Sequence, residues 1–392
     1  MVPSLAEPTI LIVPQSVVED LDEIRAIVRE AGFLPLHEIV VKRINSSCYL
    51  GRGKLEEVKR IIEDNDVKKI CVYDELRPRQ ITCLLRELKV EVLDKVLLIL
   101  NIFAQHAGSK EANLQIELAR LRHELPLIRD WVRRAKLKEL PGFLGPGGYA
   151  IDAYYRHAKQ RIAKLTRELN ELRCRRELER SRRRFAGLIH IAVAGYTNSG
   201  KTTLFNALTK LDKPTGTEMF TTLAPKSYGV TMCGTKIVFV DTVGFIKNIP
   251  YDIIESFNAV LEEISDSDAV LLVLDSSEDI KRIVSKLISS IEIFRKIGVV
   301  GKPLLVVMNK IDLVRDREEL IEKIRVVSEV VNSEYGDVID VVPVSALKGY
   351  GLNGVKKAIC RCVELLRKIL SITSSYSGSD IEKRAIRGSQ HM

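Results

Sequence analysis

The chain has 392 residues, of which 46% are hydrophobic and 29% are charged, and it carries a formal net charge of +9. This length suffices for two or three domains that each bury a core. No stretch reaches the roughly 18 to 20 apolar residues that span a membrane. The first residues, MVPSLAEPTILIVPQ, also lack the basic start of a signal peptide. We therefore expect a soluble, cytoplasmic protein without a membrane span.

The seven cysteines are scattered along the chain and form no C-x-x-C pair. Cys360 and Cys362 are separated by a single residue in an expected helix, so their side chains point in different directions. We expect reduced cysteines in the core rather than a disulfide framework or a zinc site. The histidines show no metal-ligand spacing either.

Residues 1–110 alternate between two hydrophobic patterns. Apolar, β-branched runs predict strands at 9–15, 68–75 and 90–100. Amphipathic segments predict helices at 19–32 and 77–89. This alternation is typical of an N-terminal α/β domain with a small parallel sheet. The stretch GRGK at 51–54 lacks the spacing of a phosphate-binding loop, and we interpret it as the turn that opens a helix.

Between residues 111 and 186, apolar residues recur at steps of three and four, the spacing of a helical seam. The first stripe consists of Leu114, Leu118, Leu121, Leu125, Ile128, Val132 and Ala135. The second consists of Ile151, Tyr155, Ala158, Ile162, Leu165, Leu169 and Leu172. The proline- and glycine-rich segment LPGFLGPGGYA separates them. We expect an antiparallel helical hairpin with a glycine-rich tip; a plain loop between two core helices is the alternative.

Positive charge is concentrated in the second of these helices. Residues 151–186 contain twelve basic and five acidic residues, hence a net charge of +7. Clustered Lys and Arg attract phosphates and release counterions on binding, so we expect a polyanionic partner. A solvated helix face is the alternative. The run RCRRELERSRRR at 173–184 would end the helix and form a basic linker.

Strand and helix patterns alternate again from 187 to 370. Continuous apolar runs predict strands at 188–195, 236–244, 269–277, 303–312 and 338–346. They predict a doubly wound α/β domain whose ligand site lies at the C-terminal ends of the strands. The Ser-rich residues 371–392 predict a flexible tail, and its end, RGSQHM, resembles a cloning remnant.

The stretch GYTNSGKTT follows the first of these strands and opens a helix. Its spacing is that of a P-loop, in which backbone N–H groups surround the phosphates. Lys201 would reach the β- and γ-phosphate oxygens, and the Thr202 hydroxyl would bind Mg²⁺. The expected contacts with nucleotide are Gly195, Tyr196, Thr197, Asn198, Ser199, Gly200, Lys201, Thr202 and Thr203.

Further motifs follow other strands. Asp241 ends a buried strand and is placed to bind Mg²⁺ through water, while Gly244 allows backbone contact with a γ-phosphate. The Asp312 carboxylate could accept hydrogen bonds from guanine N1–H and the exocyclic amine, a donor pair that adenine lacks. The expected guanine site consists of Asn309, Lys310, Asp312, Ser345, Ala346 and Leu347.

These motifs resemble those of translation-factor-class GTPases across the whole C-terminal half. The resemblance implies GTP or GDP with Mg²⁺, and a loop threonine that senses the γ-phosphate and the metal. Thr222 in TEMFTTLAP takes this place, with Thr221 as the second choice and an ordinary loop threonine as the alternative. The implied metal ligands are Thr202, Thr222 and Asp241.

Two residues bear on hydrolysis. Phe245 stands where a glutamine would orient the attacking water, so we expect slow intrinsic hydrolysis. Asn198 occupies a position at which a subset of related GTPases binds a monovalent cation such as K⁺, which would stabilise transition-state charge. A simple fit of asparagine to the loop is the alternative. The expected catalytic residues are Lys201, Thr222, Gly244 and Asn198.

The stretch LILNIFAQHAGSKEANLQIELARLRHELP resembles a signature of the HflX family. A glycine-rich loop, a long basic helix and a GTPase domain follow it in the order of that family. The resemblance implies a GTPase that binds the large ribosomal subunit, with the hairpin and the N-terminal domain against ribosomal RNA. Some members dissociate ribosomes under stress. Gly148 stands where the family usually has glutamate after Gly-Pro-Gly.

Our leading hypothesis is a monomeric GTP-hydrolysing switch that acts on the ribosome. GTP would order the loops around Thr222 and Gly244 and thereby change ribosome affinity. The alternative is an RNA-binding or assembly scaffold in which GTP turnover is incidental. Stimulation of turnover by ribosomal particles distinguishes the two.

Overall fold

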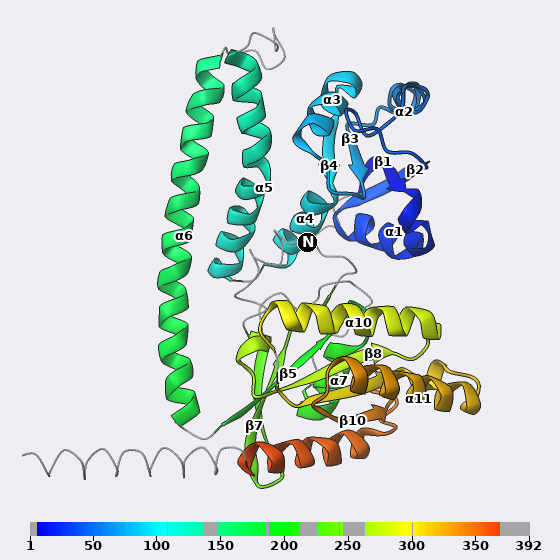
Figure 1. The fold of residues 1–392 in the computed structure, drawn as a ribbon, viewed down its shortest axis with the longest axis vertical. Coiled ribbons are helices and arrows are strands. Elements are labelled where there is room, and N and C mark those ends of the chain that lie inside the picture. The colour runs from blue at the N-terminus through cyan, green and yellow to red at the C-terminus, as the bar shows by residue number, and fades with distance from the viewer. Residues whose placement is uncertain are drawn as a thin grey trace, which may run out of the picture. The chain divides into compact units, whose positions relative to one another are not determined.

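The computed structural model describes residues 6–107, 109–136, 148–185, 188–211, 226–242, 244–245, 263–299 and 301–368. The chain divides into two compact units, the first built mainly from Met1–Glu179 and the second mainly from the residues that follow (Figure 1). Within the described ranges, no helix is long and apolar enough to cross a membrane.

The first unit contains a parallel sheet of four strands in the order β2-β1-β3-β4. The strands are β1 (Glu7–Pro14), β2 (Phe33–Val41), β3 (Lys69–Val72) and β4 (Glu91–Asp94). The predicted parallel α/β domain is confirmed. Strand β2 was not predicted from the sequence: it lies at an edge of the sheet and exposes Leu34 and Leu36, so it lacks the continuous apolar pattern of a central strand.

Three α-helices and a 3₁₀ helix, η1 (Gln15–Asp20), connect these strands, and a fourth α-helix follows β4. The α-helices are α1 (Leu21–Glu30), α2 (Arg52–Asn65), α3 (Pro78–Leu88) and α4 (Lys95–His106). Gly51 is the N-cap of α2, so the GRGK stretch does open a helix. The expected strand at 90–100 was partly wrong, because it ends at Asp94. The Asp94 carboxylate accepts a hydrogen bond from the Leu97 N–H at 3.0 Å and starts α4 there.

Helices α5 (Lys110–Lys136) and α6 (Gly148–Phe185) form the predicted antiparallel hairpin (Figure 1). Leu114, Leu118 and Leu165 pack together at its seam. Arg161 makes two hydrogen bonds to the Glu117 carboxylate, at 2.6 and 2.7 Å, and these fix the register of the two helices. The glycine-rich tip lies in residues 137–147, outside the described residues.

The hairpin is attached to the α/β domain through α5. Trp131 Nε1 donates a hydrogen bond to Thr82 Oγ1 of α3 at 3.0 Å. His123 Nε2 lies 2.7 Å from Asp94 Oδ2, the carboxylate that caps α4. Asp94 is buried, so this contact lies in the interior of the first unit. Helix α5 therefore packs on α6 along one stripe and on the sheet domain along another.

The second unit is built on a mixed sheet of six strands in the order β10-β9-β8-β5-β7-β6. All neighbours are parallel except β6 and β7. The strands are β5 (Ile189–Gly195), β6 (Lys226–Met232), β7 (Thr235–Asp241), β8 (Ala269–Asp275), β9 (Leu304–Asn309) and β10 (Val338–Pro343). The predicted doubly wound domain is confirmed, with β6 as an additional edge strand.

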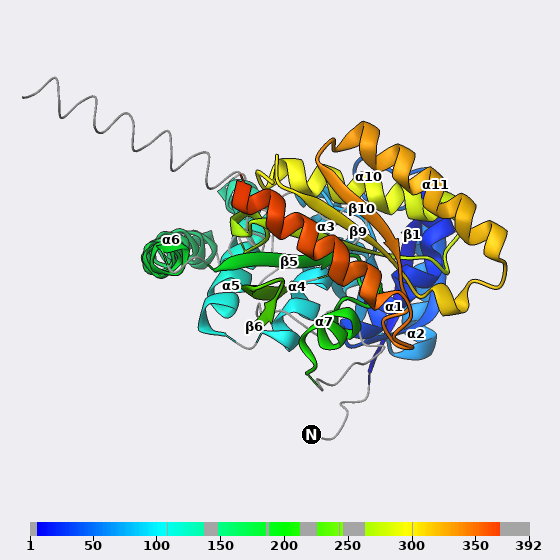
Figure 2. The same ribbon diagram turned by 90° about the horizontal axis from the view of Figure 1, so that it is seen from below.

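Helices cover both faces of this sheet (Figure 2). Helix α7 (Lys201–Thr209) and the helix at 352–368 share one apolar core with the sheet. Helices α10 (Ile280–Lys296) and α11 (Arg317–Glu334) share a second core on the opposite face. Because the inner strands are covered on both sides, every residue of β9 is buried, as its uninterrupted apolar sequence predicts.

The prediction that all cysteines are reduced was wrong. Cys48 is bonded to Cys83, and Cys233 to Cys360; Cys71, Cys174 and Cys362 are free. The partners are 35 and 127 residues apart in sequence, a separation at which spacing carries no signal. By restricting the unfolded chain, such crosslinks contribute at most about 4 and about 5 kcal/mol to stability. The second disulfide holds the β6–β7 turn against the helix at 352–368.

Candidate active site

The loop between β5 and α7 has a backbone that requires glycine at two positions. Gly195 has φ +146° and Gly200 has φ +87°, values that side-chain-bearing residues rarely adopt. A Cβ atom at Gly195 would meet the Val273 carbonyl, and one at Gly200 would meet the Asn309 side chain. Asn198 also has a positive φ, +59°, a conformation that asparagine tolerates well. The loop is therefore held close against β8 and β9.

Lys201 is the first residue of α7 and is buried. Its Nζ donates a hydrogen bond to the Tyr196 carbonyl at 2.6 Å, so its side chain folds back over the loop. Burial lowers the pKa of Lys201 to about 8, although the neighbouring Asp241 acts in the opposite direction. This desolvated ammonium group is arranged to interact with an anion in the loop.

Thr202 and Asp241 place two side-chain oxygen atoms close together near Lys201. The Thr202 hydroxyl lies 3.4 Å from Asp241 Oδ2, and Asp241 is almost fully buried at the end of β7. Among the described residues, no group of three or more His, Cys, Asp or Glu side chains could hold a metal ion. A hydroxyl and one carboxylate do fit Mg²⁺, which takes few protein ligands and completes its shell with phosphates and water.

The segment after β7 is hydrogen-bonded to the P-loop. Phe245 N donates to the Gly195 carbonyl and Thr197 N donates to the Phe245 carbonyl, both at 2.9 Å. A Cβ atom at Gly244 would lie 2.9 Å from Lys201 Nζ and 2.8 Å from Thr197 Cγ2, so a side chain there would crowd the loop. Gly244 is therefore placed next to the lysine.

Phe245 points away from the loop's anion site and into the core. Its ring is 1% exposed and meets Tyr196 and Phe294 edge to face, with centroids 6.2 and 5.9 Å apart. Edge-to-face packing of buried aromatic rings is favourable beyond the area it removes from water. The ring has no polar atom with which to hold a water molecule.

Three loops meet at the site through Asn309. Its Nδ2 donates to the Ser199 carbonyl at 2.9 Å, and its Oδ1 accepts from the Ala346 N–H at 3.0 Å. The next residue, Lys310, is held by a 2.6 Å ion pair with Asp275 at the end of β8. Asp275 was missed by sequence reasoning, although an acid at the end of an apolar strand is the same signal that identified Asp241.

The residues expected to recognise the base lie around this junction. Asp312 is exposed in the 3₁₀ helix η2 (Ile311–Leu313), so its carboxylate is free to meet a ligand. Ser345 is fully buried, and Leu347 is 74% exposed. Thr203 lies half-buried in the first turn of α7. Thr222 and Thr221 lie outside the described residues.

Three segments of the chain match described protein families. Residues 18–104 match the GTP-binding GTPase N-terminal family, 106–183 the GTP-binding GTPase Middle Region, and 190–310 the 50S ribosome-binding GTPase family. The GTPase HflX of Hyperthermus butylicus is 47% identical over 364 residues, which cover 92% of this chain and 96% of that protein. The chain belongs to the HflX family of GTPases.

Other HflX relatives agree with this assignment. The GTPase HflX of Saccharolobus solfataricus is 42% identical over 319 residues, which cover 81% of this chain and 88% of that protein. A crystal structure of a GTP-binding protein from Sulfolobus solfataricus in complex with GDP has a TM-score of 0.52 and 36% identity, and covers 92% of this chain and 99% of that one. This HflX-family chain is therefore a P-loop GTP hydrolase of a ribosome-binding family.

We expect the affinity of this HflX-family protein for GDP to fall as the pH rises above about 8. In the free protein the pKa of Lys201 is about 8, and bound phosphates raise it by favouring the charged form. Between these two pKa values binding takes up a proton, so the Kd should rise by up to about tenfold per pH unit. At pH values below the pKa of Lys201 in the free protein, the Kd for GDP should not change with pH.

Calorimetric titration with GDP from about pH 7 to about pH 9 checks this expectation. Guanosine is the matched control: it carries the same base without phosphates, so it reports any ionisation of the base or of the guanine site. A Kd for GDP that changes with pH no more than that of guanosine would contradict the role given to Lys201.

Proposed function

We propose that this protein is a GTP-driven switch that acts on the large ribosomal subunit. The observation that carries the proposal is the attachment of Gly244 and Phe245 to the P-loop beside the buried Lys201. A γ-phosphate at Lys201 would lie against this segment, and its loss would remove a contact there. Binding and hydrolysis of GTP would thereby change the segment's position, and with it the affinity for a partner.

In this proposal Lys201 binds the β- and γ-phosphate oxygens, and backbone N–H groups from Gly195 to Thr203 surround the phosphates. Mg²⁺, held by Thr202, Asp241 and Thr222, would neutralise phosphate charge during hydrolysis. Gly244 provides a backbone N–H for the γ-phosphate. The Asp241 carboxylate and the Thr202 hydroxyl, 3.4 Å apart, support this assignment.

The guanine base would bind between the loops that Asn309 joins. Asp312 accepts hydrogen bonds from the base, and the N–H groups from Ser345 to Leu347 reach its O6 atom. Lys310, fixed by Asp275, would lie along the base. The exposed position of the Asp312 carboxylate supports this role.

Intrinsic hydrolysis should be slow, because the Phe245 ring is buried and cannot orient an attacking water. Asn198 would bind K⁺ and so supply positive charge in the transition state. The exposed side chain and the left-handed backbone of Asn198 support this role, since both turn the residue out of the loop's interior.

We propose four parts with different roles. Residues 1–110 and the hairpin at 111–186 contact ribosomal RNA, residues 187–370 bind and hydrolyse GTP, and residues 371–392 form a tail. Basic side chains such as Lys164, Arg167 and Arg175 are exposed along α6, where phosphates could reach them. The protein would act as a monomer in the cytoplasm, in ribosome dissociation or a stress response.

The alternative is an RNA-binding or assembly scaffold in which GTP turnover is incidental. Its support is the buried Phe245, which cannot orient water from the position where a glutamine would do so. In a scaffold, RNA affinity would be the same with GTP and GDP, whereas a switch requires a difference.

The test is GTP hydrolysis with and without purified large ribosomal subunits, in potassium and in sodium. We expect stimulation of at least about tenfold by the subunit, the scale of a typical coupling between sites. Potassium dependence would support the role of Asn198. If the subunit does not stimulate hydrolysis in either salt, and binds equally well in GTP and GDP, the result would support the scaffold function instead of the switch.

A variant with Lys164 and Arg167 changed to glutamate distinguishes an effect on subunit binding from an effect on GTP hydrolysis. Its hydrolysis without subunits should equal that of the native protein, because both side chains are exposed on α6, outside the nucleotide site. Its affinity for the subunit should fall and depend less steeply on salt. Unchanged affinity would mean that this face of α6 is only solvated.

A further inference from the structure

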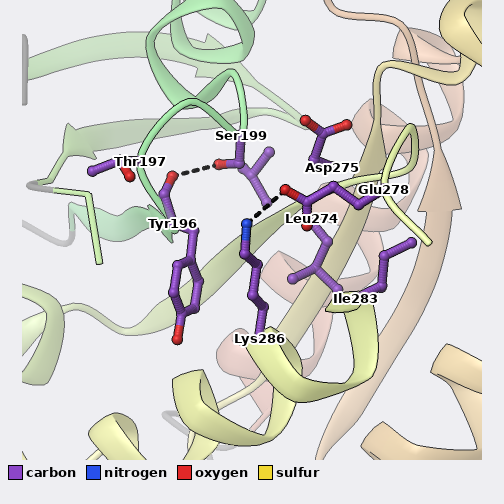
Figure 3. A pocket seen from close by; sticks show the side chains of 9 residues that line it. Tyr196, Thr197, Ser199, Leu274, Asp275, Glu278, Ile283 and Lys286 are labelled. Carbon is purple, nitrogen blue, oxygen red and sulfur yellow. Dashed lines mark hydrogen bonds and ion pairs between the residues drawn. The ribbon is translucent and has the colours of Figure 1, made fainter. Parts of the chain in front are cut away.

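Behind the P-loop lies a small cavity of about 10 Å³, close to the size of one water molecule (Figure 3). One wall is the P-loop itself, through Tyr196 and Ser199. The opposite wall is α10, through Lys286, whose side chain extends past the Tyr196 ring toward Glu278 (Figure 3). None of the nucleotide-binding motifs includes Glu278 or Lys286.

Lys286 and Glu278 form an ion pair with restricted access to water. Lys286 Nζ lies 2.6 Å from Glu278 Oε1, and the two side chains are 16% and 23% exposed. The other carboxylate oxygen, Glu278 Oε2, is buried and has no hydrogen-bond partner among the described residues. Among the described residues, Lys286 therefore compensates the negative charge of Glu278, and this ion pair fixes the position of the Lys286 ammonium group.

The same ammonium group lies 5.2 Å from the centroid of the Tyr196 ring. A cation at this distance is attracted to the ring, more strongly when both are withdrawn from water. Tyr196 is 2% exposed, and its ring also meets Phe245 edge to face. The ring is thus held between α10 and the segment that follows β7.

The backbone of Tyr196 is the point at which the P-loop lysine is held. Its carbonyl accepts hydrogen bonds from Lys201 Nζ at 2.6 Å and from Ser199 Oγ at 2.9 Å. The ring and this carbonyl belong to one residue, so contacts that hold the ring on both sides restrict how far the backbone of Tyr196 can shift. A shift of that backbone would redirect the carbonyl and displace the ammonium group of Lys201.

We propose that Lys286 is a positioning residue for nucleotide phosphate. It fixes the Tyr196 ring through its charge, and Glu278 fixes Lys286. The Tyr196 carbonyl then holds Lys201 where the phosphates bind. This inference rests on the proposed role of Lys201 in binding phosphate.

The variant Lys286→Met tests this role, because methionine fills similar space without charge. We expect GDP to bind about tenfold more weakly and to dissociate correspondingly faster, the loss of a desolvated cation–ring contact. The KM for GTP should rise likewise, while kcat at saturating GTP changes less than about twofold. Guanosine affinity should not change, because guanosine carries no phosphate. Lys286→Arg should restore GDP binding, since arginine can make both contacts.

Two further variants keep the result interpretable. Lys296→Met removes an exposed lysine from the end of the same helix and should leave GDP affinity unchanged. If Lys286→Met does not fold, Glu278→Gln combined with Lys286→Met removes the uncompensated charge yet still lacks the contact with Tyr196. GDP binding by the folded double variant should also be about tenfold weaker.

Native GDP affinity in a folded variant that lacks Lys286 would overturn the proposal. So would a loss of affinity that is equal for GDP and guanosine, or one that arginine does not restore, because either indicates general damage to the fold. The variant Lys201→Ala, measured in parallel, distinguishes failure of the phosphate site from failure of the role of Lys286. If Lys201→Ala keeps native GDP affinity, the proposed phosphate site is wrong. If Lys201→Ala loses GDP affinity while the variants without Lys286 keep it, only the role of Lys286 is wrong.

Discussion

The variant Lys201→Ala is expected to lower kcat/KM for GTP by about 10²- to 10³-fold, the usual effect of removing one preorganised donor from a transition state. Lys201 is buried and hydrogen-bonded within the P-loop, so its ammonium group needs little rearrangement to meet phosphate. A charged donor in a site of low polarity interacts more strongly than one in water. Alanine supplies no donor to the phosphates or to the Tyr196 carbonyl.

Steady-state hydrolysis and GDP titration measure this loss. The Tm should stay within about 4 °C of the native value, which corresponds to about 1 kcal/mol for a domain of this size. Lys296→Ala, at the exposed end of α10, is the matched lysine control and should behave as the native protein. Hydrolysis by Lys201→Ala within about threefold of the native rate would contradict the assigned phosphate site.

The variant Asp312→Asn is expected to change base preference from guanine to xanthine. A carboxylate accepts two hydrogen bonds from guanine, whereas the asparagine amide offers one acceptor and one donor. Xanthine carries a carbonyl where guanine carries its amine, so it fits the amide. An unmatched pair of polar groups should weaken GDP binding by about 10²-fold. Asp312 is exposed in η2, so its substitution should not affect folding.

Competition between GDP and xanthosine diphosphate for the same protein measures this preference directly. The control Asp337→Asn alters an exposed aspartate outside the motif and should keep the native preference for GDP. If Asp312→Asn still prefers GDP by the native ratio, the base is recognised by other groups. If it binds neither nucleotide while its Tm is unchanged, the loop has lost its geometry rather than its specificity.

Features that depend on neighbours in sequence were predictable. The P-loop follows from glycines, a lysine and a threonine at fixed spacing between a buried strand and a helix, and the structure has that arrangement at β5 and α7. Parallel strands with both faces covered have continuous apolar sequences, which located β8 and β9. The C-terminal ends of such strands meet at one edge, which brings Asp241 and Asn309 close to the P-loop.

Edge strands and helix starts were harder to predict. Strands β2 and β6 lie at sheet edges, where exposed residues such as Leu34 and Tyr228 break the buried pattern. The apolar residues after Asp94 suit a strand or a buried helix equally, since a short apolar run has no period. The Asp94 side chain favours the helix at this point, because it caps the N-terminus of α4.

The sequence by itself determined the HflX family and the order of the α/β domain, hairpin and GTPase domain, and it predicted which residues would bind phosphate and base. The family rests on the resemblance of the signature stretch and the order of the motifs, and the expected elements rest on local spacing and periodicity; neither requires knowledge of long-range contacts. Only the tertiary structure showed which cysteines form disulfides, Cys48 with Cys83 and Cys233 with Cys360. It also showed that Phe245 is buried in the core and that Lys286 lies over the Tyr196 ring. These are contacts between residues far apart in the chain, and packing of the helices on the sheets decides them.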